Sequence, residues 1–216
     1  MNTDRMRVSI VLLAAGQSSR MGGPLKQLIE VSGEPLVRRS ARTALLLDPE
    51  ELVVVTGAGQ GAVEEALSGL PLRCVFNADH ERGQPTSVAA GVAALSQPCD
   101  VVMVMPVDLP LIDAADLQFL CDAYREMESG SIAVPFFEGR RGNPVRFSSS
   151  HAVEVAMGRT NVGCRKLIEN NPDLVGIVAV PNDHFVVDMD TPQDFGQVLE
   201  RLAASQPFPP VAERPC

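Results

Sequence analysis

The first clear pattern in the chain is VSIVLLAAGQSSRMGGPLKQ, residues 8–27, where an apolar run leads directly into a glycine-rich basic loop. The run Val8–Ala14 is almost continuously apolar and rich in β-branched residues, which predicts a strand buried on both faces. Three glycines and two cations follow it: Gly16, Gly22, Gly23, Arg20 and Lys26. Glycine lets backbone N–H groups approach an anion closely. The loop matches neither G-x-x-x-x-G-K-S/T nor G-x-G-x-x-G, so its residues alone leave open both a phosphate cradle and a solvated surface loop.

Apolar runs and helical patterns alternate along the next hundred residues. The runs at 51–57, 72–77 and 100–106 predict further buried strands. Helical patterns follow these strands, beginning near 35 and near 60 and covering 86–96 and 113–128. Apolar strands separated by helices are typical of a parallel sheet that is covered on both faces. Ligands of such sheets bind beyond the carboxyl ends of the strands.

The pattern changes after Ser131. Residues 131–137 and 144–147 resemble paired strands around the turn EGRRGN. Two short helices, two strands and a last helix are then predicted, at 148–157, 161–170, 174–180, 184–190 and 192–203. We therefore expect a single Rossmann-like, doubly wound α/β domain over residues 1–204, with a mostly parallel sheet, helices on both faces and a small β-rich extension on the substrate side. The proline-rich residues 205–216 are expected to form a flexible tail.

The composition excludes several classes of function. A formal net charge of −9 over 216 residues argues against binding to nucleic acid. No apolar run approaches the roughly 18 residues that a membrane span needs. The five cysteines are widely spread and form no C-x-x-C pair, so neither a zinc site nor a disulfide framework is indicated. Because the N-terminus also lacks a secretory signal, we expect a cytoplasmic protein that binds neither nucleic acid nor membrane.

Asp108 follows the predicted strand at 100–106, between Pro106 and Pro110. The prolines disfavour a helix and hold the carboxylate in a fixed loop. Asp113 is the expected N-cap of the next helix, so Asp108 is left without a capping role. A carboxylate at this sheet edge suits Mg²⁺, which binds one or two carboxylates together with substrate phosphates.

A second acidic pair, Asp188 and Asp190, lies at the end of the predicted strand 184–190. The two side chains alternate with Met189 and are expected to face the same side. Thr191 and Asp194 form the T-x-x-D pattern of a capping box at the start of the last helix. One aspartate of the pair could cap or form an ion pair, and the other could complete a metal site with Asp108.

The polar segment 77–87 precedes the predicted helix 86–96. Asn77, Gly83 and Ser87 could contact a base, a ribose or an anion, because a helix N-terminus favours negative charge. N-capping by Thr86 or Ser87 is the simpler interpretation of the same residues.

A second glycine-rich turn, VVVTGAGQG, places Gly57, Gly59 and Gly61 between a strand and a helix. It imitates a dinucleotide-binding fingerprint, with Asp79 and Glu81 about twenty residues further on. The spacing is G-x-G-x-G, however, and an ordinary strand-to-helix turn is favoured. A dinucleotide oxidoreductase remains an alternative that rests on this turn.

The segment LLAAGQSSRMGGPLK, residues 12–26, resembles the signature of the MobA-like NTP transferases, and in particular their MocA-type molybdenum cofactor cytidylyltransferase branch. Four further segments resemble family motifs in the family's order: RGQPTSVAAG at 82–91, VDLPLI at 107–112, GRRGNPVRF at 139–147 and VVDMDTPQDF at 186–195. The resemblance extends from about Val8 to Leu202 and implies a fold of the nucleotide-diphospho-sugar transferase type. Its departures are Asn143 for a frequent histidine, Asn161 for a frequent aspartate and Arg146 for an apolar residue, all in the later half where the acceptor is expected to bind.

The resemblance implies a role for each motif residue. Residues that would grip the NTP phosphates are Gly16, Arg20, Gly22 and Lys26. Residues that would line the nucleotide site are Leu13, Ala14, Ala15, Ser18, Asn77, Gly83 and Ser87. Asp108 would hold Mg²⁺, with Mn²⁺ as an alternative, helped by Asp188 or Asp190. Arg20, Lys26 and Asp108 would be the catalytic groups.

The first motif also bears on the nucleotide. The family's guanylyl branch tends to have L-A-G-G and its cytidylyl branch L-A-A-G with a serine two residues on, so Leu13–Gly16 and Ser18 point to CTP. The implied reaction is attack by a terminal phosphate of a pterin-type acceptor on the α-phosphate of CTP, with release of pyrophosphate. A phosphate nucleophile is already ionised, so no general base is required, and catalysis rests on positioning and charge neutralisation.

Besides the oxidoreductase, further alternatives to this leading hypothesis remain. The transferase could use GTP or another phosphorylated acceptor such as a sugar phosphate, or the chain could bind nucleotides without turnover. A molybdoenzyme or its chaperone is a candidate partner that would receive the product.

Overall fold

The computed structural model describes residues 5–17, 25–128, 130–157 and 164–204. The predicted flexible tail at 205–216 and the motif residues Ser18, Arg20, Gly22 and Asn161 lie outside the described residues. None of the described helices is long and apolar enough to cross a membrane. The cytoplasmic location stays a prediction.

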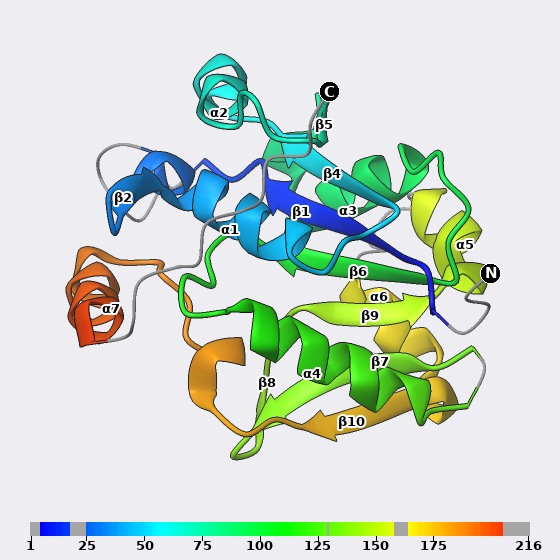
Figure 1. The fold of residues 1–216 in the computed structure, drawn as a ribbon. Coiled ribbons are helices and arrows are strands. Elements are labelled where there is room, and N and C mark those ends of the chain that lie inside the picture. The colour runs from blue at the N-terminus through cyan, green and yellow to red at the C-terminus, as the bar shows by residue number, and fades with distance from the viewer. Residues whose placement is uncertain (1–4, 18–24, 129, 158–163, 205–216) are drawn as a thin grey trace.

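An eight-stranded sheet forms the centre of the molecule (Figure 1). Its strands are β1 (Val8–Ala14), β4 (Glu51–Thr56), β5 (Arg73–Phe76), β6 (Val101–Pro106), β7 (Ile132–Phe137), β8 (Arg140–Arg141), β9 (Val145–Ser148) and β10 (Val175–Ala179). The order is β10-β7-β9-β6-β1-β4-β5, with β8 paired to β7. A separate two-stranded sheet is formed by β2 (Glu30–Val31) and β3 (Glu34–Pro35).

The strand directions define one common carboxyl edge. β1 pairs in parallel with β4 and β6, β4 with β5, and β7 with β10. β9 is antiparallel to both β6 and β7, and β8 is antiparallel to β7. β7 therefore points the same way as β6, because two antiparallel steps separate them. The loops after β1, β6, β7 and β10 consequently leave the sheet at the same edge, where ligands of doubly wound sheets bind.

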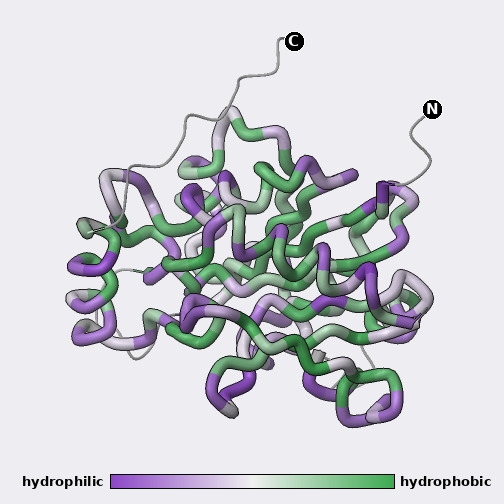
Figure 2. Tube along the Cα trace, turned by 60° about the horizontal axis from the view of Figure 1, so that its bottom comes forward, coloured by the Kyte–Doolittle hydropathy of each residue, from purple (hydrophilic) through white to green (hydrophobic). Residues whose placement is uncertain are grey.

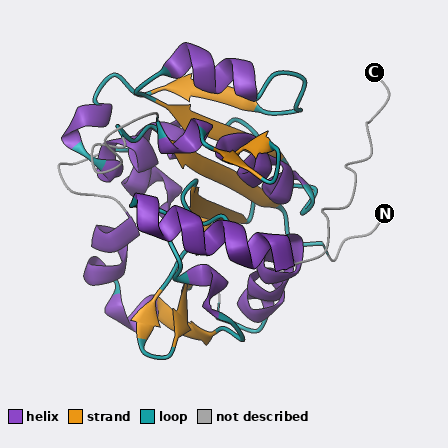
Figure 3. Ribbon diagram, turned by 90° about the vertical axis from the view of Figure 1, so that its left-hand side faces the viewer, coloured by secondary structure: helices purple, strands orange, loops and turns teal. Residues whose placement is uncertain are grey.

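Helices cover both faces of the sheet, as Figures 1 and 3 show. They are α1 (Leu36–Leu45), α2 (Gln60–Ala66), α3 (Gln84–Ala93), α4 (Ala114–Arg125), α5 (Ala152–Ala156), α6 (Cys164–Asn170) and α7 (Pro192–Ala204). Alternate residues of β1 belong to two apolar clusters: Ile10 and Leu12 pack with α1, α2 and α4, and Val11 and Leu13 pack with α3, α5 and α6. In Figure 2 much of the trace in the interior is hydrophobic, and many of the outer turns are hydrophilic. The predicted doubly wound α/β fold is confirmed.

The predicted strand at 184–190 is wrong. Asp183–Phe185 form a short 3-10 helix, and residues 187–190 have no regular structure. Phe185, Val186 and Met189 are all buried in the same apolar cluster, a spacing that a strand with alternating faces cannot provide. The apolar residues Val186 and Val187 led to the prediction of a strand, but they belong to an irregular segment that folds over the sheet edge.

The α3 helix packs closely on β1 and β4 through Gly91. A Cβ at this position would overlap the side chains of Val11 and Val55. β-branched residues are stiff and yield little. The glycine thus sets how near the start of α3, with Gly83 and Ser87, lies to the end of β1.

We predict that Gly91→Ala lowers the free energy of unfolding, measured by urea denaturation. Overpacking costs about 1–3 kcal/mol, which outweighs the roughly 1 kcal/mol that alanine gains over glycine in a helix. Gly61→Ala in α2 is the matched control, because no atom lies within 4 Å of the added Cβ and the change should be neutral or stabilising. Equal effects of the two substitutions would show that Gly91 is not a packing constraint.

Candidate active site

A pocket of about 280 Å³ opens at the carboxyl edge, beside the ends of β1 and β6. The two strands stay paired to their ends, because the backbone N–H of Val107 donates to the carbonyl of Leu13 at 3.1 Å. Among the residues that line the pocket are members of the first motif, of RGQPTSVAAG and of VDLPLI: Leu13, Ala15, Gly16, Lys26, Gly83, Ser87 and Asp108. The sheet therefore brings together segments that the sequence analysis selected separately. Ala14 belongs to the apolar cluster on the opposite face.

Lys26 joins two of the predicted metal-binding carboxylates. Its Nζ lies 2.6 Å from Oδ2 of Asp108 and 2.7 Å from Oδ1 of Asp190. The lysine side chain is only 14% exposed. Burial opposes its charge, but the Asp108 and Asp190 carboxylates outweigh that penalty and raise the pKa of Lys26 above its ordinary value. The backbone N–H of Met189 also donates to the carbonyl of Asp108 at 3.0 Å, which fixes the two acidic segments side by side.

Asp188 adds a third carboxylate to this group. Burial, followed by the charges of Asp190 and Asp108, raises the pKa of Asp188. The carboxylates of Asp108, Asp188 and Asp190 repel one another, and two of them contact the ammonium of Lys26. Together they form a set of hard oxygen ligands that fits Mg²⁺ or Mn²⁺. The residues present are thus suited to the divalent cation that the fold family implies.

Gln27 is a site residue that the sequence analysis missed. Its side chain is fully buried, and its Nε2 donates to the carbonyl of Gly16 at 3.1 Å and to that of Ala58 at 3.4 Å. These bonds fix Lys26, its neighbour, relative to the end of β1. No local pattern marks a glutamine for this role, because both acceptors belong to other segments of the chain.

Asn77 organises the segment before α3. Its Nδ2 donates to the hydroxyls of Thr86 at 2.8 Å and Ser87 at 3.0 Å, and its Oδ1 accepts from the backbone of Asp79. Asn77 is buried and does not line the pocket, whereas Ser87 does. The helix begins earlier than predicted, at Gln84 with Gly83 as N-cap, so N-capping by Thr86 or Ser87 is wrong. Gly83 has a φ of 103°, a conformation that other residues rarely adopt.

A second cavity of about 620 Å³ adjoins the first and shares Leu13, Gln84 and Pro106 with it. Apart from Gln84, its polar lining comes from the later part of the chain: Arg141, Asn143, Arg165, Lys166 and Glu169. Three cations against one carboxylate make this wall basic in an otherwise acidic protein. Asn143, one of the departures from the family pattern, faces this cavity.

Arg146, another departure, lines neither cavity. It is fully buried between β9 and α4, with its guanidinium 5.1 Å from the centre of the Tyr124 ring. None of its side-chain nitrogens has a hydrogen-bond partner among the described residues. Burial lowers the pKa of Arg146. Arg146 therefore lies away from both cavities and belongs to the packing beneath α4.

Gly57 and Gly59 of the second glycine-rich turn are explained by packing. A Cβ on Gly57 would lie 2.7 Å from the carbonyl oxygen of Ala15 and from His80, and one on Gly59 would overlap Leu25. Gly59 is the N-cap of α2 with a φ of 66°. The turn therefore packs against the first loop, as an ordinary strand-to-helix turn would.

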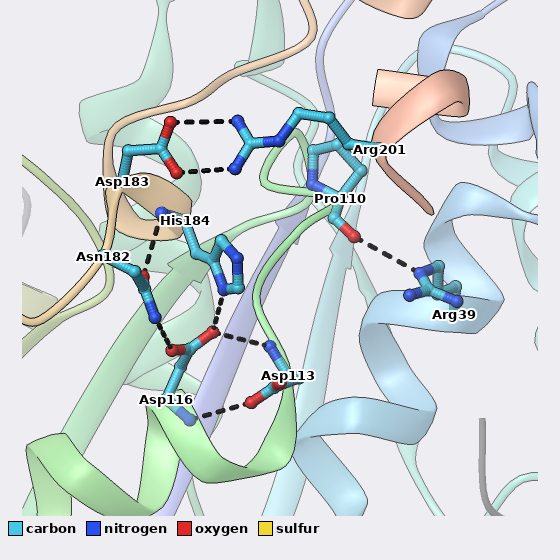
Figure 4. Close-up of polar contacts among 8 residues, drawn as sticks. All are labelled: Arg39, Pro110, Asp113, Asp116, Asn182, Asp183, His184 and Arg201. Carbon is cyan, nitrogen blue, oxygen red and sulfur yellow. Dashed lines mark hydrogen bonds and ion pairs between the residues drawn. The ribbon is translucent and has the colours of Figure 1, made fainter. Parts of the chain in front are cut away.

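A second polar cluster joins α4 to the irregular segment after β10 (Figure 4). Asp113 and Asp116 form the capping box of α4, and Asp116 also accepts from Nδ1 of His184 at 2.7 Å. The ligand atoms of Asp113, Asp116 and His184 lie within 4.8 Å of one another and could hold a metal ion. The sequence analysis gave His184 no partner, because the two residues are 68 positions apart.

Comparison with known proteins identifies a family model and several relatives that match most of the chain. The family model described as the MobA-like NTP transferase domain matches residues 10–175. The nicotine blue oxidoreductase of Paenarthrobacter nicotinovorans is 30% identical over 203 residues, which cover 92% of this chain and 99% of the relative. The probable molybdenum cofactor guanylyltransferase of Natronomonas pharaonis is 28% identical over 201 residues, covering 89% and 97%.

Among solved structures, Rv0371c from Mycobacterium tuberculosis H37Rv is 26% identical and superposes with a TM-score of 0.78, covering 90% of this chain and 98% of that chain. A structure of Rv0371c in complex with manganese superposes with a TM-score of 0.70 at 23% identity, covering 90% and 99%.

We predict that Lys26→Met lowers the free energy of unfolding at neutral pH by about 1–3 kcal/mol, because partly buried carboxylates lose their counter-charge. Since the folded-state pKa of Lys26 is raised, its contribution is present throughout the neutral range and disappears only as the pH rises through that raised value. Lys166→Met is the control: its side chain is 45% exposed and 3.8 Å from Glu169, so the change should be small. Equal stability of the two variants would contradict the role of Lys26.

Proposed function

Because this chain belongs to the MobA-like NTP transferase family of nucleotidyltransferases, we propose that it transfers CMP from CTP to the phosphate of molybdopterin and releases pyrophosphate. The observation that carries the proposal is the ion-paired cluster of Lys26, Asp108 and Asp190, of which Lys26 and Asp108 line a pocket that adjoins a larger basic cavity. The nucleotide occupies the smaller pocket and the acceptor the larger one.

The nucleotide's phosphates lie against the loop after β1. Gly16 offers backbone at the pocket wall, and Lys26 supplies charge between that loop and the carboxylates. The start of α3, at Gly83 and Ser87, faces the same pocket and favours a negative group. Arg20 and Gly22 are proposed to complete the phosphate grip, with Ser18 beside the base. Leu13 and Ala15 form the apolar wall against which the nucleoside rests.

Asp108 and Asp190 are proposed to hold Mg²⁺, with Asp188 as a further carboxylate beside them. Mn²⁺ is an alternative, and the relative Rv0371c has been solved with manganese. When bound, the divalent cation neutralises charge on the phosphate oxygens that develops during transfer. Lys26 orients the two carboxylates and adds positive charge at the α-phosphate. The acceptor's phosphate is itself the nucleophile, so the protein's work is alignment of the two substrates.

The basic cavity supports an anionic acceptor. Arg141, Arg165 and Lys166 line it together with Asn143, and its volume of about 620 Å³ suits a ligand the size of a pterin phosphate. The cavity and the nucleotide pocket adjoin at Leu13, Gln84 and Pro106. An acceptor phosphate in the cavity can therefore approach the α-phosphate of a nucleotide in the pocket. A sugar phosphate is an alternative acceptor with the same charge. The product is proposed to pass to a molybdoenzyme or its chaperone.

A second candidate function is an oxidoreductase, favoured by the name of the relative from Paenarthrobacter nicotinovorans. In this chain the candidate rested on the turn at Gly57–Gly61. The packing of Gly57 and Gly59 against Ala15, His80 and Leu25 explains both glycines without a dinucleotide. The transferase is therefore preferred.

The test is a nucleotide panel that measures initial rates of pyrophosphate release with Mg²⁺, molybdopterin and CTP, GTP, ATP or UTP. We predict that CTP is preferred and that Asp108→Ala lowers kcat by at least about 100-fold, the size expected when a group that stabilises transition-state charge is lost. Asp122→Ala removes an exposed carboxylate of α4 and should leave the rates unchanged.

Each other outcome corrects a different part of the proposal. Unchanged release by Asp108→Ala would show that the metal site is wrong. Preference for GTP, or for a sugar phosphate, would change only the substrate. Nucleotide binding without release would indicate a binding module, and tight NADH binding, seen by fluorescence, would favour the oxidoreductase.

A further inference from the structure

The segment 181–191 carries Asp188 and Asp190 to the candidate cation site, although most of it lacks regular structure. It runs from β10 to α7 and contributes no strand to the sheet. A carboxylate on such a segment is placed by side-chain and backbone contacts, because no strand ladder fixes it. The contacts that hold this segment therefore decide where Asp190 lies relative to Asp108.

Two side chains of the segment contact Asp116 at the start of α4 (Figure 4). Asp116 is only 5% exposed. Its Oδ2 accepts from Nδ1 of His184 at 2.7 Å, and its Oδ1 accepts from Nδ2 of Asn182 at 2.8 Å. The backbone N–H of Asp113 donates to the same Oδ2 at 3.1 Å. Asp116 thus ties the segment to the element that follows Asp108 in the chain.

Further contacts fix the rest of the segment. Arg201 of α7 forms two bonds with Asp183, at 2.9 and 2.6 Å. The backbone N–H of Asn143 donates to the carbonyl of Phe185 at 2.9 Å, and Met189 donates to the carbonyl of Asp108. In this set the His184–Asp116 pair joins a 28% exposed imidazole to a 5% exposed carboxylate, and His184 lies four residues before Asp188.

We propose that His184 and Asp116 are positioning residues that hold residues 182–190 so that Asp190 faces Asp108, and that they thereby set the affinity of the site for its divalent cation. The inference rests on the proposed function, because it takes Asp108 and Asp190 as the cation's ligands. Neither His184 nor Asp116 touches substrate in this account. They act through the backbone of the segment.

The charges around His184 favour its protonated form. The hydrogen bond to Asp116 raises the pKa of His184, burial opposes this, and the charges of Asp116 and Asp113 add to the rise while Arg201 lowers it. Burial opposes ionisation of Asp116, but the bonds from His184 and Asn182 hold the pKa of Asp116 below its ordinary value. Asp183, on the same segment, is paired with Arg201. The charged contact is therefore complete below the ordinary histidine pKa of about 6.5 and is lost as the pH rises through the raised value.

The three groups Asp113, Asp116 and His184 could alternatively hold the metal themselves. Their atoms are already engaged: both oxygens of Asp116 accept hydrogen bonds, and Oδ1 of Asp113 accepts from the backbone of Asp116. The positioning role uses these bonds as they stand, whereas a bound ion would have to displace them. The experiment distinguishes the two.

The experiment titrates the full chain with Mn²⁺ alone and reads free Mn²⁺ by electron paramagnetic resonance, between about pH 6 and pH 8.5, the range that spans histidine titration. We expect His184→Gln to weaken Mn²⁺ binding about tenfold at the lower pH, the size found for lost support of a metal ligand. The difference from wild type should shrink as the pH rises, because the wild-type histidine then loses its charge. A purely structural role would give no such pH dependence.

Three further variants complete the design. His151→Gln alters a histidine that contacts the carbonyl of Gly130 far from this segment, and it should bind Mn²⁺ as wild type does. Asp108→Asn should lose Mn²⁺ binding. Asn182→Ser keeps an oxygen that can accept from the backbone N–H of His184 but removes the amide donor to Asp116. It therefore tests the contact between the segment and Asp116 if His184→Gln fails to fold. It should weaken binding severalfold.

The outcomes separate the two levels of the account. If Asp108→Asn loses Mn²⁺ and the His184 and Asn182 variants bind as wild type does at every pH, the positioning role is overturned and the proposed function stands. If the wild-type chain binds no Mn²⁺, the metal site of the proposed function fails and this inference fails with it. If His184→Gln abolishes binding and Asp108→Asn does not, the ion sits at Asp113, Asp116 and His184, and both assignments are wrong.

Discussion

The ion pairs from Lys26 to Asp108 and Asp190 are the interaction on which the site depends. They join three segments that are as far as 164 residues apart in the chain, the loop after β1, the loop after β6 and the segment before α7. Carboxylates gathered at one point repel one another, so the arrangement is stable only with a cation between them. The ammonium of Lys26 meets that need in this structure, and a divalent cation would meet it during nucleotidyl transfer.

The rest of the fold serves to bring these segments to one edge. β1 and β6 pair in parallel to their ends, so Gly16 and Asp108 leave the sheet together. Gly91 lets α3 approach β1 closely, which brings Ser87 to the same pocket. The antiparallel β9 lies between β6 and β7, so β7 and β10 do not pair directly with β6. The larger cavity is lined by Arg141, Arg165 and Lys166 from this later part of the chain. The two pockets adjoin at Leu13, Gln84 and Pro106.

The parts predicted from sequence are those whose signals are local. The apolar runs of β1 and β6, the N-cap at Asp113 and the capping box of Thr191 and Asp194 need only neighbouring residues, and the structure bears them out. The strand predicted at 184–190 was wrong, because the burial of these residues comes from packing over the sheet edge and not from the alternating faces of a strand. His184 and Gln27 could not be found, since their partners are distant in sequence. The burial of Arg146 could not be predicted for the same reason, because only the fold brings its guanidinium to 5.1 Å from the Tyr124 ring.

The central claim is that Asp108 and Asp190 meet at one cation site beside the nucleotide. Anomalous diffraction at the manganese edge, from crystals grown with Mn²⁺ and a non-hydrolysable CTP analogue, tests it most directly. The account predicts an anomalous peak about 2.1 Å from carboxylate oxygens of both Asp108 and Asp190, with Lys26 turned toward the phosphates. A peak among Asp113, Asp116 and His184, or bound nucleotide with no peak near Asp108, would contradict it.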